Sequence, residues 1–169
     1  VTEKSYAEVV ETEILDPAGM TNSTYLDFKK LIPKRATDYI REDGQIFHRI
    51  QADFADGNGA SGLVSTVEDL LLWDRALQSN LLLSQQYQDE LFKPQVTKYA
   101  PYYYGYGWYL ADLTINDRLT RIEYHSGGGS CFIMRNVAEG HTIILLNNIH
   151  SDNLYDISLE LLTAIQSDK

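Results

Sequence analysis

The stretch that decides the fold is residues 125–135, which read His125-Ser126-Gly127-Gly128-Gly129-Ser130-Cys131-Phe132-Ile133-Met134-Arg135. Here a glycine-rich turn leads into an apolar segment of the kind that forms a strand. Residues 142–146, Thr142-Ile143-Ile144-Leu145-Leu146, form a second apolar segment after a turn at Glu139-Gly140. Because its apolar residues do not alternate with polar ones, we expect this second strand to be covered on both faces.

Strand signals continue upstream of this stretch. Residues 104–111 and 119–124 are rich in aromatic and β-branched side chains, and Asn116-Asp117 lies between them as a turn. The chain therefore predicts a meander of four antiparallel strands over residues 104–146.

A helix is expected after the strands, beginning at Asp152. The apolar residues that recur at helical spacing, and that should form its buried face, are Leu154, Ile157, Leu161 and Ile165. Strands in a meander with helices before and after them predict an α+β fold, in which helices pack against an antiparallel sheet.

The first half of the chain carries helix signals. Ser5-Tyr6-Ala7-Glu8 and Ser65-Thr66-Val67-Glu68 both match the capping box, in which a Ser hydroxyl and a Glu three residues later satisfy N–H groups of the first turn. They predict a helix over about residues 5–15, stopped by Pro17-Ala18-Gly19, and a second helix from Ser65. A third helix should run from Leu83-Ser84 to Pro94.

Residues 21–62 have weak periodicity and read as a long loop, which in a compact domain is often functional. They contain one hairpin signal, Tyr39-Ile40-Arg41-Glu42 and Gln45-Ile46-Phe47-His48 around the type I′ turn pair Asp43-Gly44. We therefore divide the chain into a helix with a long loop (1–62), a helical segment (63–95), antiparallel strands (99–150) and a C-terminal helix (152–167).

Composition bounds the function. The chain has 169 residues, 44% of them apolar, so it can form a core. Its net charge of −10 argues against binding to nucleic acid or to an anionic membrane surface. No apolar run approaches the roughly 20 residues of a membrane span. The first residues, Val1-Thr2-Glu3-Lys4, also lack the pattern of a signal peptide.

Two motif matches carry little functional information. Gly57-Asn58-Gly59-Ala60-Ser61-Gly62 fits G-x-G-x-x-G, but a poor strand precedes it and the next helix has its own cap, so a flexible loop is favoured over a nucleotide site. The histidines His48, His125, His141 and His150 lack metal-ligand spacing. We therefore expect no metal and no cofactor.

The segment His125-Ser126-Gly127-Gly128-Gly129-Ser130 is the most informative for function. A histidine can move a proton or bind an anionic group, and glycines let a ligand approach the backbone. The alternative is a glycine-rich turn with an exposed histidine beside it, and the residues alone leave both open. Cys131 begins an apolar strand, so we expect a buried, inert thiol rather than a nucleophile.

Tyrosines are unusually frequent, and six of the 12 lie between Tyr99 and Tyr109. They could line a pocket or stack on a substrate. The ordinary alternative is a half-buried strand, which we favour for at least half of them.

Five segments of this chain occur in a recognisable order. They are residues 5–21, residues 59–70 with Trp73, Tyr104-Gly105-Tyr106-Gly107-Trp108, His125-Ser126-Gly127-Gly128, and residues 143–148. In this order they resemble the SYAE…PLGMT, GAGGLVST, YGYGW, HSGG and VVVLSNN segments of the serine β-lactamase and penicillin-binding-protein-like hydrolases, the class C-like branch that includes DD-peptidases and esterases. The resemblance covers nearly the whole chain. It implies a β-lactamase/transpeptidase-like fold and acyl-enzyme hydrolysis of an ester, amide or β-lactam bond.

Two elements that the family's chemistry needs are missing from the sequence. Ser-x-x-Lys supplies the nucleophile and a base, and Tyr-x-Asn supplies a second proton-transfer group. No Lys here has a Ser three residues before it, and no Tyr has an Asn two residues after it. Ser151-Asp152-Asn153 follows the His-Ser-Gly strand instead of preceding it, so we interpret it as a helix cap. We therefore expect the chain to be the C-terminal portion of a larger hydrolase domain, incomplete and inactive alone.

The resemblance assigns roles to four positions. His125 would assist proton transfer and anion binding, and Ser126 would hydrogen-bond the substrate's carboxylate or carbonyl. Gly127 would leave room for the acyl chain, and the N–H of Gly128 would be a donor of the oxyanion hole. The turn after them is shorter than the family's usual connection, which leaves the substrate class open.

The resemblance also implies partners. The parent would bind a small acyl substrate or a peptidoglycan-like peptide and would act in the periplasm or outside the cell. Without the family's N-terminal strands, the strand Thr142-Ile143-Ile144-Leu145-Leu146 would have an unpaired edge, so we expect self-association there. The alternative function is a non-catalytic module on the same scaffold that binds a peptide or a protein.

Overall fold

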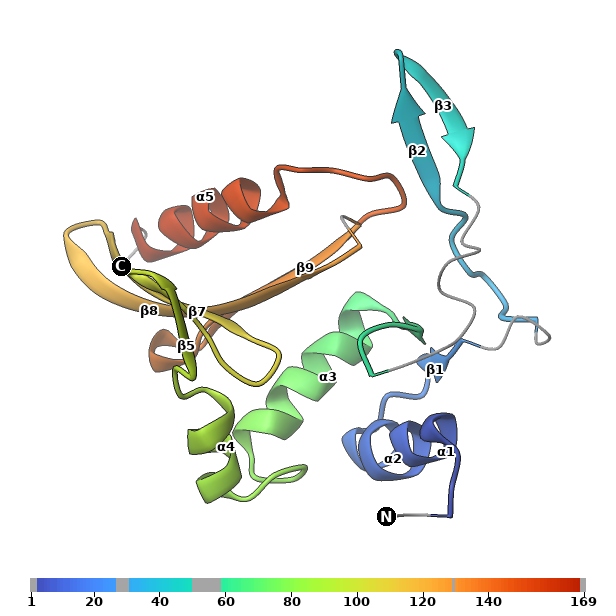
Figure 1. Cartoon of the computed structure of the whole chain (residues 1–169), viewed down its shortest axis with the longest axis horizontal. Coiled ribbons are helices and arrows are strands. Elements are labelled where there is room, and N and C mark those ends of the chain that lie inside the picture. Colours follow the sequence, from blue (N-terminus) through green and yellow to red (C-terminus); the bar gives the residue numbers. More distant parts are fainter. Residues whose placement is uncertain (1–2, 27–30, 50–58, 129, 168–169) are drawn as a thin grey trace. The chain divides into compact units, whose positions relative to one another are not determined.

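The structure is a computed structural model that describes residues 3–26, 31–49, 59–128 and 130–167. The chain forms two compact units (Figure 1). Unit 1 comprises Val1–Leu82 and Asn148–His150, and unit 2 comprises Leu83–Asn147 and Ser151–Lys169. Among the described residues, no helix is long and apolar enough to cross a membrane.

Unit 1 opens with a continuous helical run made of α1 (Tyr6–Val10), the π-helical η1 (Glu11–Leu15) and α2 (Asp16–Ala18). The first capping box is confirmed, since the N–H of Glu8 donates to Ser5 Oγ at 3.3 Å and the N–H of Ser5 donates to Glu8 Oε2 at 2.7 Å. The predicted end near residue 15 is wrong. Pro17 lies in the first turn of α2, where proline is tolerated, and Gly19 ends the run with a left-handed φ of 73°.

Helix α3 (Val67–Gln78) has a different cap from the one predicted. Thr66, not Ser65, accepts a hydrogen bond from the N–H of Asp69 at 3.2 Å. The Ser65 hydroxyl instead lies 2.7 Å from the hydroxyl of Ser23. The buried carboxylate of Asp69 also accepts from the N–H of Asn22 and the hydroxyl of Ser23, both at 2.7 Å, and so holds the loop after α2. The apolar core here consists of Val10, Leu15 and Met20, with Ile14, Ala18, Leu70, Leu72 and Trp73 packed against it.

Two short strand pairs complete unit 1. The hairpin of β2 (Tyr39–Glu42) and β3 (Gln45–His48) is confirmed, with Asp43 and Gly44 at φ 48° and 78°. Strand β1 (Thr24–Tyr25) lies within the predicted loop of residues 21–62 and pairs with β4 (Leu63–Val64), which directly follows that loop. Residues 27–30 and 50–58 of that loop, which include the first two positions of the G-x-G-x-x-G match, lie outside the described residues.

Unit 2 contains an antiparallel meander with helix α5 (Leu154–Ser167) packed on it, which confirms the α+β fold class. Over the residues that the structure describes, the sheet has six strands in chain order, and β10 lies at its end. The elements are α4 (Gln85–Leu91), β5 (Val96–Tyr99), β6 (Tyr102–Tyr104), β7 (Tyr109–Ile115), β8 (Arg118–Gly127), β9 (Cys131–Asn136), the 3-10 turn η3 (Val137–Glu139), β10 (His141–Leu146) and α5 (Leu154–Ser167).

The prediction of one strand over residues 104–111 is wrong. The N–H of Gly105 donates to the carbonyl of Trp108 at 2.8 Å, and Gly107 has a left-handed φ of 83°, so a tight turn separates β6 from β7. Tyrosine and tryptophan in a turn carry the same compositional signal as in a strand, which is why the sequence pattern concealed this turn and the strands β5 and β6.

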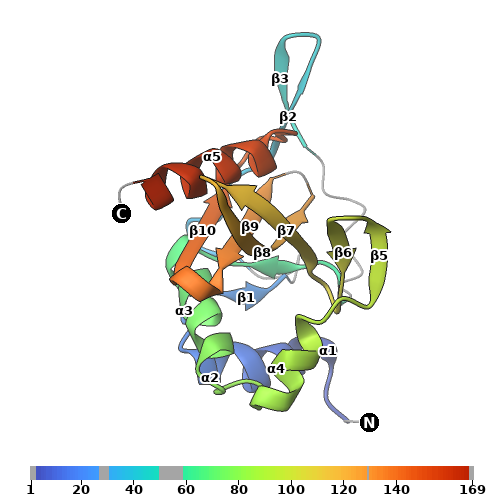
Figure 2. The ribbon, with the colours of Figure 1, turned by 90° about the vertical axis from the view of Figure 1, so that its left-hand side faces the viewer.

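Helix α5 covers one face of β9 and β10 (Figure 2). Its predicted buried face is correct only at Leu154. The buried residues are Leu154, Ser158, Leu162 and Gln166, whereas Ile157, Leu161 and Ile165 are 36%, 43% and 42% exposed. Ser158 and Gln166 are polar residues on the buried face, so counting apolar residues does not select them.

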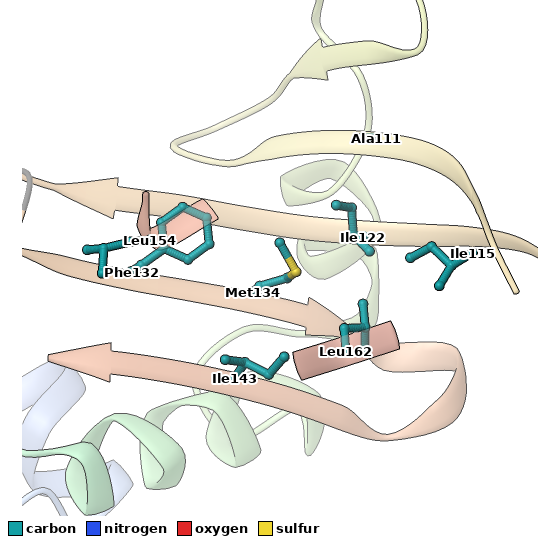
Figure 3. Close-up of a cluster of buried hydrophobic side chains, with 8 residues drawn as sticks. All are labelled: Ala111, Ile115, Ile122, Phe132, Met134, Ile143, Leu154 and Leu162. Atoms are coloured by element: carbon teal, nitrogen blue, oxygen red, sulfur yellow. The ribbon is translucent and has the colours of Figure 1, made fainter. Parts of the chain in front are cut away.

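The core of unit 2 lies between α5 and the sheet (Figure 3). Its members are Ala111, Ile115, Ile122, Phe132, Met134, Ile143, Leu154 and Leu162. In β10, Ile143 is buried in this cluster and Leu145 packs against it, but Leu146 is 42% exposed. Full coverage of both faces of this strand, as predicted, is therefore not reached at its end.

Candidate active site

The His-Ser-Gly segment forms the end of a strand. His125, Ser126 and Gly127 are the last residues of β8 and pair with β9 on one side. On the other side, the β7–β8 ladder stops at the pair Tyr109 and Tyr124. Within the part of the chain that the structure describes, no strand therefore pairs with this edge of β8 at residues 125–127. An open edge of this kind can hydrogen-bond an extended ligand.

His125 lies in a group of tyrosines. Its Nε2 is 3.3 Å from the hydroxyl of Tyr104, and its ring lies 5.6 Å from that of Tyr109 between centroids. Which of the two groups donates depends on the histidine tautomer. Of the Tyr-rich stretch, the structure thus brings Tyr104 and Tyr109 to the predicted catalytic histidine.

Lys98 is a member of this group that sequence reasoning missed. In the β5–β6 ladder, Thr97 pairs with Tyr103 and Tyr99 pairs with Tyr102, so Lys98 is the extra residue of a β-bulge. Its Nζ lies 4.6 Å from the ring centroid of Tyr109 and 3.4 Å from the hydroxyl of that residue. The sequence pattern does not predict strand β5, and a single lysine there has no feature that marks it as part of a site.

The two glycines of the site have different constraints. A Cβ on Gly127 would lie 2.5 Å from Cys131 Sγ, so a larger residue there would force the sulfur to move. Gly128 has a left-handed φ of 54°, which glycine adopts without strain. Ser126, Gly127 and Gly128 are exposed, and Gly129 lies outside the described residues.

Cys131 lies against the same strand end. Burial raises the pKa of its thiol, and the hydrogen bond to the Gly127 carbonyl lowers it by less. A thiol that ionises above its usual range is a poor nucleophile at neutral pH. This supports the interpretation of Cys131 as an inert packing residue.

The other histidines have contacts of their own. The rings of His48 and Tyr39 pack at a tilt, 5.0 Å apart between centroids, and His141 Nδ1 lies 4.0 Å from Glu139 Oε2. Among the described residues, no three His, Cys, Asp or Glu side chains gather as a metal site would require.

Comparison with known proteins decides the family. The family model Beta-lactamase matches residues 1–166. The chain belongs to the β-lactamase family. This places it among relatives of penicillin-binding proteins and relates it to hydrolases, as the motif order predicted.

Two curated relatives of this β-lactamase-family chain come from Bacillus subtilis. Penicillin-binding protein 4* is 28% identical over 90% of this chain, and the putative penicillin-binding protein PbpX is 26% identical over 66%. The chain spans 37% of the length of the first and 27% of the second.

Solved structures confirm the fold of this β-lactamase-family chain. The penicillin-binding protein from Bacillus halodurans matches 95% of the chain with a TM-score of 0.79 at 24% identity, and the chain covers 49% of that protein. The D-amino acid amidase from Ochrobactrum anthropi matches 98% with a TM-score of 0.77 at 19% identity, and the chain covers 52% of it. The chain therefore has a β-lactamase/transpeptidase-like fold, and it matches about half the length of each of these neighbours.

Proposed function

We propose that this chain supplies the His-Ser-Gly-Gly wall of a serine hydrolase site, in a parent that hydrolyses an ester, amide or β-lactam bond through an acyl-enzyme. The observation that carries the proposal is the open edge of β8 at residues 125–127, beside the tyrosine group that contacts His125. An acyl substrate lying along that edge would meet a histidine and backbone N–H groups together.

Each residue of the wall has a distinct role in this proposal. His125 gives or takes a proton and attracts an anionic group of the substrate. Ser126 hydrogen-bonds the carboxylate or carbonyl, and the N–H of Gly128 stabilises the oxyanion of the tetrahedral intermediate. The exposed Gly127 leaves room for the acyl chain.

The nucleophile and its base come from outside the 169 residues in this proposal, because the sequence contains neither Ser-x-x-Lys nor Tyr-x-Asn. The chain then corresponds to the C-terminal portion of the hydrolase domain and has no activity alone. The names of the B. subtilis relatives, both penicillin-binding proteins, support a β-lactam as one ligand class. The resemblance to that family adds a peptidoglycan-like peptide as another.

Amide NMR tests the assignment of the wall. The isotope-labelled chain is titrated with acetyl-D-alanyl-D-alanine, a short peptide with a free carboxylate. We expect the largest shifts at the amides of Ser126 and Gly128, and a Ser126→Ala variant should weaken binding severalfold. A titration that leaves residues 125–128 unmoved would contradict the proposal.

A non-catalytic binding module is the second candidate. The same absence of Ser-x-x-Lys and Tyr-x-Asn favours it, because an open strand edge can bind a peptide without chemistry. The gene sequence upstream decides between the two candidates. Ser-x-x-Lys encoded upstream supports the hydrolase, and an upstream region without it supports the module.

We propose that the isolated chain pairs with a second copy of itself through β10. In the described sheet, β10 pairs with β9 and lies at the end of the strand order, with the exposed Leu146 at its end. An edge strand of this kind can pair with another chain. Sedimentation should show concentration-dependent dimers that Leu146→Lys weakens, and a monomer at all concentrations would contradict the proposal.

A further inference from the structure

The segment Tyr104-Gly105-Tyr106-Gly107-Trp108 forms a turn that is anchored to its surroundings. A Cβ on Gly105 would lie 2.9 Å from the carbonyl oxygens of Leu91 and Lys93, so only glycine lets this turn approach the end of α4 so closely. The N–H of Gln95 also donates to the carbonyl of Tyr104 at 2.9 Å. The backbone at Tyr104 and Gly105 is therefore held from two directions.

Trp108 anchors the other end of this turn. Its buried ring packs edge-on against Phe92 at 5.4 Å between centroids. The guanidinium of Arg135, on β9, lies 4.8 Å from the ring centroid of Phe92 and 5.4 Å from that of Trp108. Arg135 Nη1 is 3.2 Å from Glu123 Oε2 on β8. The turn is thus tied to the strand that carries His125.

Tyr104, the first residue of the turn, directs its hydroxyl to His125. The distance from the hydroxyl to Nε2 is 3.3 Å, and Tyr109 packs edge-on against Tyr104 at 4.7 Å between ring centroids. A histidine at an open strand end can rotate its ring. A hydrogen bond to one ring nitrogen restricts that rotation. Because a phenol hydroxyl is a better donor than acceptor, it favours the tautomer in which Nε2 accepts and Nδ1 carries the proton.

We infer that Tyr104 is a positioning residue: its hydroxyl, held in place by the Gly105–Trp108 turn, keeps the imidazole of His125 in one orientation and one tautomer at the open edge of β8. The consequence for catalysis rests on the proposed function, because proton transfer requires the correct ring nitrogen within reach of the substrate. Tyr104 acts only through His125 in this account.

Nitrogen-15 NMR of the histidine rings in the full chain tests this inference. The signals of His125 are assigned by their loss in His125→Gln, and spectra are recorded where the ring is neutral. We expect one dominant tautomer in the unsubstituted chain. Tyr104→Phe removes only the hydroxyl and should change the tautomer ratio severalfold, towards that of a free histidine side chain in water.

Tyr106→Phe is the matched control, since Tyr106 belongs to the same turn and its side chain is 60% exposed. It should leave the ratio unchanged, and amide spectra should show both variants folded. If Tyr104→Phe has the same tautomer ratio as the unsubstituted chain, the inference is overturned. This failure is distinct from that of the proposed function, which is judged by the peptide titration and does not depend on the ratio.

Discussion

Gly127 and Cys131 are paired residues at the end of the β8–β9 ladder. At Gly127, the proposed substrate role and the packing against Cys131 both favour a small residue. The family motif assigns to Gly127 the role of leaving room for an acyl chain. The structure adds a second requirement, because a Cβ there would meet Cys131 Sγ at 2.5 Å. A substitution at Cys131 separates these two reasons for glycine, because it changes the packing and leaves the proposed space for the acyl chain.

Gly127→Ala should therefore destabilise the chain by about 1–3 kcal/mol, the usual cost of overpacking. Cys131→Ala removes the sulfur, so the double variant should recover most of that loss. Chemical denaturation of the four proteins measures both effects. If the losses of stability in the two single variants add up in the double variant, the contact with Cys131 is not the cause of the destabilisation by Gly127→Ala.

The reactivity of Cys131 provides a test by pH. Because burial raises the pKa of this thiol, the reactive thiolate forms at higher pH in the folded chain than in the unfolded chain. Alkylation by iodoacetamide at pH 8 should be slower in the folded chain than after denaturation, and the rate should rise as pH increases. Stability should fall over the same alkaline range, since the unfolded thiol loses its proton first. Equal alkylation rates in the two states would contradict this.

At the scale of secondary-structure elements, the correspondence between sequence and structure depends on how local the signal is. Asp43-Gly44 determines the β2–β3 hairpin through backbone geometry within a few residues, and that hairpin was predicted correctly. The turn at Gly105 depends on its approach to the carbonyls of α4, a tertiary contact that no local pattern contains. The cap of α3 moved to Thr66 because the Ser65 hydroxyl meets Ser23, which is distant in sequence.

The candidate site follows the same division. His125, Ser126, Gly127 and Gly128 were found from a contiguous motif. Tyr104 and Tyr109 were visible only as part of a tyrosine-rich stretch, and Lys98 was not visible at all. The contacts of Tyr104 and Tyr109 with His125, and of Lys98 with Tyr109, follow from strand pairing and a bulge, which require the sheet to be known.

Helix α5 supplies an element-scale prediction from the corrected buried face. Leu162 is buried in the core and Leu161, the next residue back, is 43% exposed. Leu162→Ala should cost about 2–5 kcal/mol of stability through the cavity it leaves. Leu161→Ala should cost less than about 1 kcal/mol. Urea unfolding measures both losses of stability. Similar losses for the two variants would contradict the buried face seen in the structure and would support the one predicted from the sequence.

At the scale of the whole molecule, the main fact is the length of the match. The chain belongs to the β-lactamase family across residues 1–166, yet it spans 37% of Penicillin-binding protein 4* and about half of the solved neighbours. The His-Ser-Gly-Gly wall lies within this span, and the sequence has no Ser-x-x-Lys. The central claim is therefore that the chain carries one side of an acyl-transfer site and no nucleophile.

Covalent labelling tests this claim most directly. The purified chain is incubated with a fluorescent fluorophosphonate and, in parallel, with a fluorescent penicillin, and its intact mass is measured. We expect an unmodified mass with both reagents, because no serine of the chain has a lysine three residues after it to activate it. A stoichiometric adduct on any serine of the chain would contradict it.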